Sequence, residues 1–309
     1  MKIVVGTRGS ALALYQANLV IKLLKEKFNN SIDLEIKVIK TTGDINQKSK
    51  LSQLGLGVFT KELDISLLNG EVDIAVHSLK DVPTVWNENL EIVSTPKRDS
   101  YRDILIWNKG DDINLSQNVI VGTSSIRRSE FLKVKYPSIN IKNLRGNVDT
   151  RLRKLKNGDY DCIVLAEAGI KRLNINMDDF NYMPLDILPS PAQGAIGIGC
   201  RKDDEKIKDI LLEINHFETY ITTICERYAL KHYGGGCQAP FGSLSKYIGD
   251  KLTLNCEVVY DGRIYSFREG IKINTENKYK IIENAKKLGE KAGDYLKKAC
   301  SSKNQLNNL

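Results

Sequence analysis

Arginines gather at two places in this sequence where an apolar run passes into a helix-like segment. Arg127 and Arg128 come soon after the apolar run 119–121, and Arg145 closes a second such run, 139–144. A helix N-terminus offers unpaired backbone N–H groups to an anion, and arginine adds planar recognition of carboxylate or phosphate. The two turns therefore predict a pocket for a polyanion, and they supply these candidate ligands: Thr123, Ser124, Ser125, Arg127, Arg128, Arg145, Asn147 and Arg151.

A plainer interpretation of these turns is also open. Ser124 and Asn147 would then be helix caps, and the arginines would form a solvated helix face. For Arg153, inside the second helix, we prefer this interpretation.

A carboxylate that could do chemistry lies in the stretch His77-Ser78-Leu79-Lys80-Asp81, just past a predicted strand end. Ligands of α/β proteins bind at such strand ends. Asp81 could act as a general acid or base, or stabilise a cation formed during a reaction. On this stretch alone, a turn carboxylate before Pro83 is the simpler interpretation.

One of the six cysteines stands apart. Cys237 follows three glycines and precedes Gln238-Ala239-Pro240, whereas the other five lie in apolar or helical runs or in the tail. On an exposed loop its thiol would be a candidate nucleophile or covalent attachment point. A buried loop cysteine remains the alternative.

The composition narrows the class of protein. Of the 309 residues 41% are hydrophobic and 27% charged, as in globular proteins, and the net charge of +8 favours an anionic partner. The lysines are scattered and aromatic residues make up 7%, which argues against a nucleic-acid-binding surface. No apolar run approaches the roughly 20 residues that span a membrane, and the opening MKIVVGTRGS is typical of a strand and turn. Without paired cysteines or clustered histidines, we expect a cytoplasmic protein with no metal site.

The order of apolar runs and turns predicts an α/β fold. Strands near 2–6, 34–39 and 72–76 alternate with helices near 10–28 and 59–67, which predicts a parallel sheet covered by helices on both faces. Residues 41–57 are polar and glycine-bearing, typical of a loop. The same order restarts after residue 96, with Gly122-Thr123-Ser124-Ser125 echoing Gly6-Thr7-Arg8-Gly9-Ser10, and the two units suggest a cleft between domains.

The last third of the chain has a different composition. We expect a helix from Glu218 to Tyr233, a hairpin turning at Asp261-Gly262 and a basic helix near 277–298. The predicted domains are therefore a discontinuous first domain (1–96 and 194–214), a second (97–193) and a smaller α+β third (217–309).

These segments resemble the porphobilinogen deaminase, or hydroxymethylbilane synthase, family. The matching pieces follow the family's order: GTRGSALALYQA (6–17), TTGD (41–44), VHSLKDVPT (76–84), GTSSIRRS (122–129), LRGNVDTRL (144–152), AEAGIKRL (166–173), AQGAIGI (192–198) and GGGCQAPFG (234–242). VHSLKDVPT and GGGCQAP are highly specific to it. The resemblance implies two α/β domains of the type II periplasmic-binding-protein kind flanking a cleft, and a third domain that carries the cofactor cysteine.

The implied activity is that of a transferase in tetrapyrrole and heme biosynthesis. Four porphobilinogen molecules are joined head to tail with loss of ammonia on a covalent dipyrromethane primer, and water then releases linear hydroxymethylbilane. Cys237 matches the cysteine that holds the primer through a thioether, and Asp81 matches the catalytic aspartate, which should stay ionised among many arginines. The resemblance also implies a cytoplasmic monomer that takes a small-molecule substrate and neither nucleic acid nor a membrane as partner.

The resemblance also assigns the anion-binding residues. Cofactor contacts are implied for Ser78, Lys80, Thr123, Ser124, Ser125, Arg127, Arg128, Arg145 and Asn147. Substrate contacts are implied for Arg8, Ser10, Arg151 and Arg172. Such donors suit pyrroles that each carry an acetate and a propionate.

Two positions depart from the family pattern. Leu56 and Val58 stand where many members have a basic residue nearby, so no ligand contact is assigned to that loop, although gating by residues near 45–57 is expected. Ala192 stands where a glycine is common, which affects local backbone freedom rather than the chemistry.

The main alternative is a non-catalytic two-domain protein that binds a carboxylate ligand; it leaves Asp81 and the Gly-Gly-Gly-Cys loop unexplained. A nucleic-acid-binding protein, prompted by the positive charge, is the second alternative.

Overall fold

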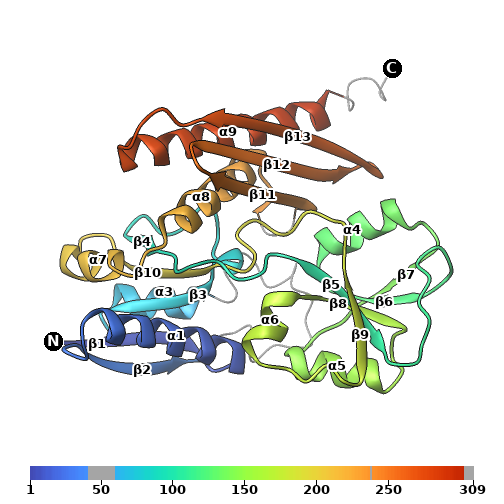
Figure 1. The fold of residues 1–309 in the computed structure, drawn as a ribbon, viewed down its shortest axis with the longest axis horizontal. Helices are drawn as coiled ribbons and strands as arrows, with labels where there is room; N and C mark the ends of the chain where they lie inside the picture. The colour runs from blue at the N-terminus through green and yellow to red at the C-terminus, as the bar shows by residue number, and fades with distance from the viewer. Residues whose placement is uncertain (41–59, 237–238, 303–309) are drawn as a thin grey trace. The chain divides into compact units, whose positions relative to one another are not determined.

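The computed structural model describes residues 1–40, 60–236 and 239–302. The chain divides into two compact units, one formed by residues 1–99 and 194–220 and the other by residues 100–193 and 221–309. Figure 1 traces the chain through both units. The second unit holds both an α/β sheet and a separate antiparallel sheet. The boundaries of the three predicted domains stay a prediction, as does the cleft.

The first unit is built on a five-stranded mixed sheet with strand order β2-β1-β3-β10-β4. Its strands are β1 (Lys2–Arg8), β2 (Asp33–Ile39), β3 (Ile74–Ser78), β4 (Leu90–Ser94) and β10 (Ile196–Arg201). β1 pairs parallel with β2 and β3, whereas β10 runs antiparallel to β3 and β4. The three strands from which a parallel sheet was predicted do pair in parallel, and the complete sheet is mixed because β10 runs antiparallel. β10 comes back from the other half of the chain, so no crossover helix dictates its direction.

Helices cover both faces of this sheet, as predicted. They are α1 (Ala11–Lys27), α3 (Lys61–Leu68) and α7 (Glu205–Leu212), and a short 3₁₀ turn, η2 (Leu79–Asp81), follows β3. Alternate residues of a strand point to opposite faces. Ile3 and Val5 accordingly pack with α1 and α7, while Leu63 and Leu67 of α3 pack in a second cluster on the other face.

The second unit contains a sheet of the same plan, with order β7-β6-β8-β5-β9. Its strands are β5 (Asp103–Asn108), β6 (Ile120–Gly122), β7 (Asn140–Lys142), β8 (Cys162–Ala166) and β9 (Phe180–Pro184). β6 pairs parallel with β7 and β8, and β5 runs antiparallel to β8 and β9. Its helices are α4 (Ile126–Lys135), α5 (Val148–Lys156) and α6 (Glu167–Arg172). The repeat of GTSS after GTRGS in the sequence thus reflects a repeated sheet topology.

The C-terminal residues form a three-stranded antiparallel sheet, and in the sequence its strands are preceded by one long helix and followed by another. The elements are α8 (Phe217–Tyr233), β11 (Phe241–Ile248), β12 (Lys251–Tyr260), β13 (Arg263–Lys272) and α9 (Lys278–Ser301). Figure 1 shows α9 running along this sheet. Asp261 and Gly262 join β12 to β13 with φ values of 50° and 67°, as a tight hairpin turn requires. The predicted hairpin and both predicted helices are confirmed.

Close packing of α9 against α8 depends on two glycines. A Cβ atom at Gly289 would lie 2.5 Å from the carbonyl oxygen of Cys225, and one at Gly293 would lie 2.5 Å from that of Ala229. Both distances are shorter than a carbon–oxygen contact allows, so only glycine permits this approach. α8 is thereby fixed immediately before the loop that carries Cys237.

Several further elements agree with the sequence, and some were not predicted. α1 begins after its N-cap Ser10 and α9 after its N-cap Asn277, in agreement with the helices expected near 10–28 and 277–298. α5 follows the turn at Arg145, where a helix was also expected. β4, β5, β9 and α7 were not predicted. The predicted loop at 41–57 lies outside the described residues.

Candidate functional site

The carboxyl ends of β1 and β3 place five of the predicted residues at one edge of the first sheet. Arg8 ends β1 and Ser10 follows it, while Ser78 ends β3 and is followed by Lys80 and Asp81 in η2. β1 and β3 are neighbouring parallel strands, so these ends lie at the same edge.

Local hydrogen bonds fix the orientation of this edge. The Ser10 hydroxyl accepts from the amide of Ala13 at 3.3 Å, and the Ser78 hydroxyl accepts from the Gln16 side chain at 2.8 Å. The amide of Leu79 donates to the carbonyl of Ala195, which anchors η2 to the residue just before β10. Lys80 and Asp81 are half-buried. A carboxylate and an ammonium group are thus held on a short, anchored turn.

In the second unit the two arginine-bearing turns lie side by side, as predicted. The Ser124 hydroxyl donates to the carbonyl of Leu144 at 2.5 Å, and the amide of Thr123 donates to the carbonyl of Lys142 at 3.0 Å. The N-cap of α4 is Ser125 rather than Ser124, because the Ser125 hydroxyl accepts from the amide of Arg128. Ser124 therefore joins the turns and does not cap a helix.

The second turn leaves donors available at its surface. Asn147 occupies the N-cap position of α5, and its side chain makes no cap bond within the described part of the chain. Gly146 has a φ of 114°, a conformation that only glycine adopts readily, and its carbonyl accepts from Arg151 Nε at 2.7 Å. Arg145 and Arg151 are half-buried, and Arg153 is exposed, as its assignment to a solvated face predicts. Arg172 lies at the end of α6 and is buried.

Arg127 and Arg128 differ from an open surface pair. Both are buried, and both bind Asp103, the first residue of β5. Burial alone would raise the pKa of Asp103, but the charges of the two arginines outweigh it and hold that pKa well below its usual value. These arginines thus belong to a buried ionic network.

Cys237 lies outside the described residues. α8 ends at Tyr233, and the glycines at 234, 235 and 236 have φ values of 93°, 80° and 55°. The other five cysteines are buried free thiols, as predicted for packing residues. Burial raises the pKa of Cys162, Cys200 and Cys225 to about 12, which leaves them unreactive at neutral pH.

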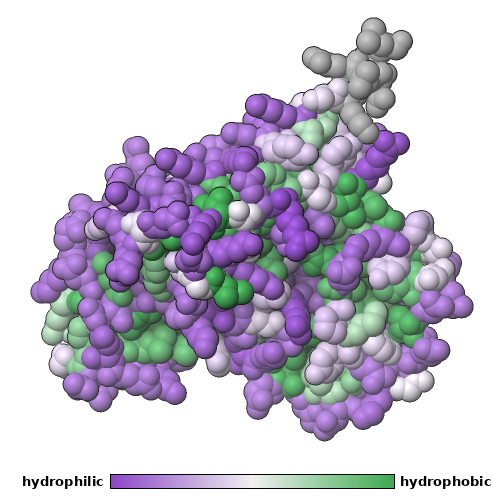
Figure 2. Space-filling model, turned by 45° about the horizontal axis from the view of Figure 1, so that its top comes forward, coloured by the Kyte–Doolittle hydropathy of each residue, from purple (hydrophilic) through white to green (hydrophobic). Residues whose placement is uncertain are grey.

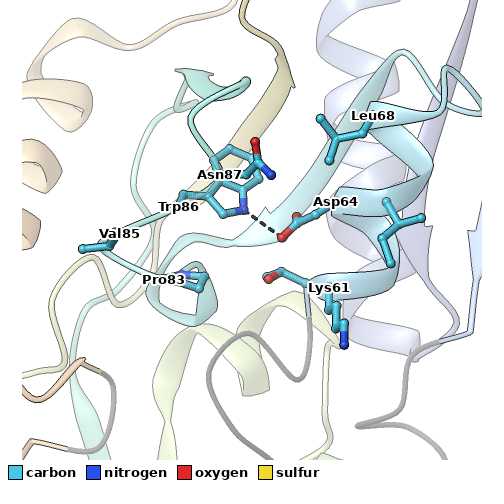
Figure 3. Close-up of a pocket in the computed structure, with 9 residues that line it drawn as sticks. Lys61, Asp64, Leu68, Pro83, Val85, Trp86 and Asn87 are labelled. Atoms are coloured by element: carbon cyan, nitrogen blue, oxygen red, sulfur yellow. Dashed lines mark hydrogen bonds between the residues drawn. The ribbon is translucent and has the colours of Figure 1, made fainter.

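A cavity of about 300 Å³ lies in the first unit between α3 and the segment after Asp81, lined by residues that include Lys61, Asp64, Pro83 and Trp86. Figure 3 shows the Trp86 indole donating to Asp64, with a nitrogen–oxygen distance of 2.9 Å. Burial raises the pKa of Asp64, although the Trp86 bond opposes this shift. The cavity contains no arginine in its lining of described residues, so it does not match the polyanion pocket predicted from the sequence.

Other classes of site receive no support from the described residues. Within them, no group of three or more histidine, cysteine, aspartate or glutamate side chains could hold a metal ion. None of the described helices combines the length and apolarity needed to span a bilayer. The face shown in Figure 2 is largely hydrophilic, with apolar residues in small patches.

Sequence reasoning missed the residues that hold the predicted ones in place. Gln16 binds Ser78, and Asp103 binds both buried arginines. In the segment before β10, Gln193 binds Asp103 and the amide of Ala192 binds Glu226. One signal was available for Asp103: it directly precedes the apolar run 104–107, and buried charges are rare unless paired. Its partners are distant in sequence and could not be inferred.

Family models and relatives identify the family of this chain. The family model described as porphobilinogen deaminase, dipyromethane cofactor binding domain, matches residues 3–209, and the C-terminal domain model of the same enzyme matches residues 220–298. A probable porphobilinogen deaminase of Methanocaldococcus jannaschii is 54% identical over 93% of this chain and 98% of that protein. The porphobilinogen deaminase of Fusobacterium nucleatum is 42% identical over 84% of this chain and 89% of that protein.

Among solved structures, the periplasmic VFT2 domain of Bordetella pertussis BvgS is similar with a TM-score of 0.42 and 16% identity, over 69% of this chain and 86% of that one. At this level the likeness adds nothing to the assignment. The two family models and the curated relatives decide it: the chain belongs to the porphobilinogen deaminase family.

Proposed function

We propose that this protein is a hydroxymethylbilane synthase whose catalytic carboxylate lies on the first sheet and whose anion-binding groups come from both sheets. It condenses four porphobilinogen molecules head to tail, releases ammonia at each condensation, and hydrolyses the product from its primer as linear hydroxymethylbilane. The observation that carries the assignment of groups is the pair of adjoining turns in the second unit, joined by the bond from Ser124 to Leu144. Family membership supports the reaction.

The donor set of the chain fits a dipyrromethane, whose pyrroles bear carboxylate side chains. Arg127 Nε is buried and has no hydrogen-bond partner among the described residues, and the Asn147 amide is not used in capping. The Ser125 and Thr123 hydroxyl oxygens accept backbone N–H groups, which leaves their hydroxyl protons to donate. The Ser124 proton is already given to Leu144, so Ser124 contributes by holding the turns together.

These residues would hold the cofactor: Ser78, Lys80, Thr123, Ser124, Ser125, Arg127, Arg128, Arg145 and Asn147. Cys237 would carry it through a thioether, and its glycine-rich approach allows the backbone to come close to the ring system. When bound, the cofactor supplies the covalent primer on which the chain is built.

Substrate carboxylates would be received by Arg8, Ser10, Arg151 and Arg172. Arg151 is oriented by the bond from its Nε to Gly146, and Arg8 lies at the same sheet edge as Asp81. A guanidinium group binds a carboxylate through two parallel N–H donors, which fixes both position and angle. These residues would therefore orient the substrate rather than take part in proton transfer.

Asp81 would be the catalytic group. Its carboxylate stabilises the positive charge left on the substrate when ammonia departs, and it assists the proton transfers at the pyrrole N–H. The short turn η2, anchored by the bond from Leu79 to Ala195, keeps this carboxylate in place. A preorganised charge of this kind needs no rearrangement at the moment of reaction.

The setting of the enzyme is part of the same proposal. Free, buried cysteines suit a reducing compartment, which favours the cytoplasm. The protein would act as a monomer, with porphobilinogen as its small-molecule partner and without nucleic acid or a membrane. Scattered lysines and few aromatic residues support this exclusion of nucleic acid.

The intact mass of the purified protein, followed by peptide mapping, tests the proposal. A covalent excess of two pyrrole units on the peptide that holds Cys237 is expected, either as purified or after incubation with porphobilinogen. Cys237→Ala should carry no adduct, whereas Cys300→Ala, a matched change at a buried cysteine, should load normally. A protein that never acquires the adduct, yet binds carboxylate ligands, would support the non-catalytic alternative, which the comparisons do not favour.

A further inference from the structure

The buried carboxylate of Asp103 accepts four hydrogen bonds from side chains. It accepts from Arg127 Nη2 at 2.6 Å, from Arg128 Nε and Nη2 at 3.0 and 2.7 Å, and from Gln193 Nε2 at 2.9 Å. Asp103 is 1% exposed, and Arg127 and Arg128 are 5% and 6% exposed. Bonds between ionised groups in such surroundings are short and directional, so the two guanidinium groups are fixed in orientation.

The charges in this network do not cancel. Two guanidinium groups face one carboxylate, which leaves one net positive charge below the surface. Each nitrogen of Arg128 makes one bond, since Nη1 donates to the carbonyl of Val164, and Nη1 and Nη2 each carry a second N–H. Arg127 keeps one buried donor, Nε, that finds no partner in the described part of the chain. An excess positive charge and an unused donor are what a bound anion would satisfy.

The same network reaches the segment that leads from β9 to β10. Arg127 Nη1 donates to the carbonyl of Leu188, and the Gln193 side chain donates to both Asp103 and the carbonyl of Tyr101. Residues 188–193 are therefore attached at both ends, through Leu188 to Arg127 and through Gln193 to Asp103.

Between those ends the segment is attached to the C-terminal elements of the same unit. The fully buried Glu226 of α8 accepts from the amide of Ala192 at 2.7 Å and from that of Ser245 at 2.8 Å. Ala192 has a φ of 60°, which is unfavourable for a residue other than glycine. The carboxylate of Glu226 thus stabilises a strained residue adjacent to Gln193.

We propose that Asp103 is a positioning residue for the anion site: acting through Arg127 and Arg128, it sets the guanidinium groups that receive the cofactor carboxylates and, through Gln193, keeps them in register with residues 188–193. This inference rests on the proposed function. Asp103 itself touches neither cofactor nor substrate. Asp103 fixes the positions of the two guanidinium groups, although its own negative charge lowers the net positive charge of the network.

Two simpler roles for Asp103 give different expectations. If Asp103 only reduced the positive charge, Asp103→Asn would add a full positive charge to the site and strengthen anion binding. If it only stabilised the fold, every correctly folded molecule of the variant would load at the normal rate. Positioning alone predicts that folded Asp103→Asn protein loads slowly although its site is more positive.

The experiment measures how fast folded apoprotein acquires the covalent adduct from porphobilinogen, followed by intact mass. The folded fraction is isolated by size-exclusion chromatography and checked by the fluorescence of Trp107, which lies on the same strand as Asp103. Loading of Asp103→Asn should be about 10- to 100-fold slower than that of the wild type, the loss typical of a displaced binding group. The matched control Asp179→Asn removes an exposed carboxylate paired with Lys156 in the same unit and should load at the wild-type rate.

A second variant decides the matter if Asp103→Asn does not fold. Gln193→Leu retains both arginine–aspartate pairs and the bond from Arg127 to Leu188, and it removes the bonds from residue 193 to Asp103 and to Tyr101. Its loading should also be slower than that of the wild type. Normal or faster loading of folded Asp103→Asn, or normal loading of Gln193→Leu where that variant alone folds, would overturn the inference. A wild-type protein that never loads would instead contradict the proposed function, so the two failures are distinguishable.

Discussion

The two α/β sheets have the same strand order, yet different side chains lie at the edges where their parallel strands end. After β1 and β3 the first sheet carries one arginine, two serines, a lysine and Asp81. After β6 and β7 the second carries hydroxyl groups, an amide and several arginines, two of them bound to Asp103. One topology therefore supports a carboxylate in one unit and a set of anion-binding donors in the other.

The two aspartates express this difference most clearly. Asp103 is enclosed and compensated by two arginines, whereas Asp81 is half-buried on a short turn. Asp103 is already paired with two fixed arginines, so its charge is not available to stabilise a cation on a substrate. Asp103 could therefore not take the role proposed for Asp81. We therefore propose a structural and orienting role for Asp103 and the chemical role for Asp81.

The sharpest test of this contrast is Asp81→Asn. Removing the charge while keeping the shape should lower turnover by about 10²- to 10⁴-fold, the usual contribution of a positioned acid–base group. Thermal stability should be nearly unchanged, because Asp81 is half-buried. Steady-state formation of hydroxymethylbilane and a melting curve measure the two effects, and a variant with normal turnover would remove Asp81 from the mechanism.

The corresponding change at the other carboxylate, Asp103→Ala, should act first on stability. It leaves two buried guanidinium groups without their counter-ion, which typically costs about 3–5 kcal/mol of unfolding free energy. Urea unfolding followed by Trp107 fluorescence in a Trp86→Phe background reports on the second unit. Asp179→Ala, at an exposed ion pair, should cost less than about 1 kcal/mol. Equal costs for the two variants would show that the buried network does not contribute as its geometry implies.

The lowered pKa of Asp103 predicts a specific dependence on acid. The folded protein keeps this carboxylate ionised below the pKa of about 3.9 that it has in the unfolded chain. The stabilisation is therefore complete above about pH 4 and declines as the pH falls toward the folded pKa. In this range the unfolding free energy of the wild type should fall more steeply than that of Asp103→Asn, by about 1.4 kcal/mol per pH unit for one proton. Parallel slopes would contradict the assigned shift.

The smallest expected effect concerns the first sheet edge. Gln16→Leu removes the donor that holds the Ser78 hydroxyl and should cost about 1 kcal/mol of stability, with a few-fold rise in the KM for porphobilinogen. Asn18→Leu is a matched control, because the Asn18 amide donates to the carbonyl of Leu14 on the exposed side of the same helix. A rise in KM for the control as well would show that the effect comes from the helix and not from Ser78.

Much of this protein follows from its sequence, because the signals concerned are local. Apolar periodicity, the helix starts near Ser10 and Asn277 and the Asp261-Gly262 turn each depend on residues close together in the chain, and the structure confirms them. The motifs of the family, such as VHSLKDVPT and GGGCQAP, are equally short and local, so the amino-acid sequence alone was sufficient to recognise the family.

The tertiary structure decided what depends on residues distant in sequence. The direction of β10, the burial of Arg127 and Arg128, and the partners of Asp103 and Glu226 arise from contacts across tens of residues. A sequence shows that an arginine is present, but its environment determines whether the charge faces a ligand or a buried carboxylate. The candidate site residues could therefore be proposed from the sequence, whereas the residues that hold them in place emerged only from the fold.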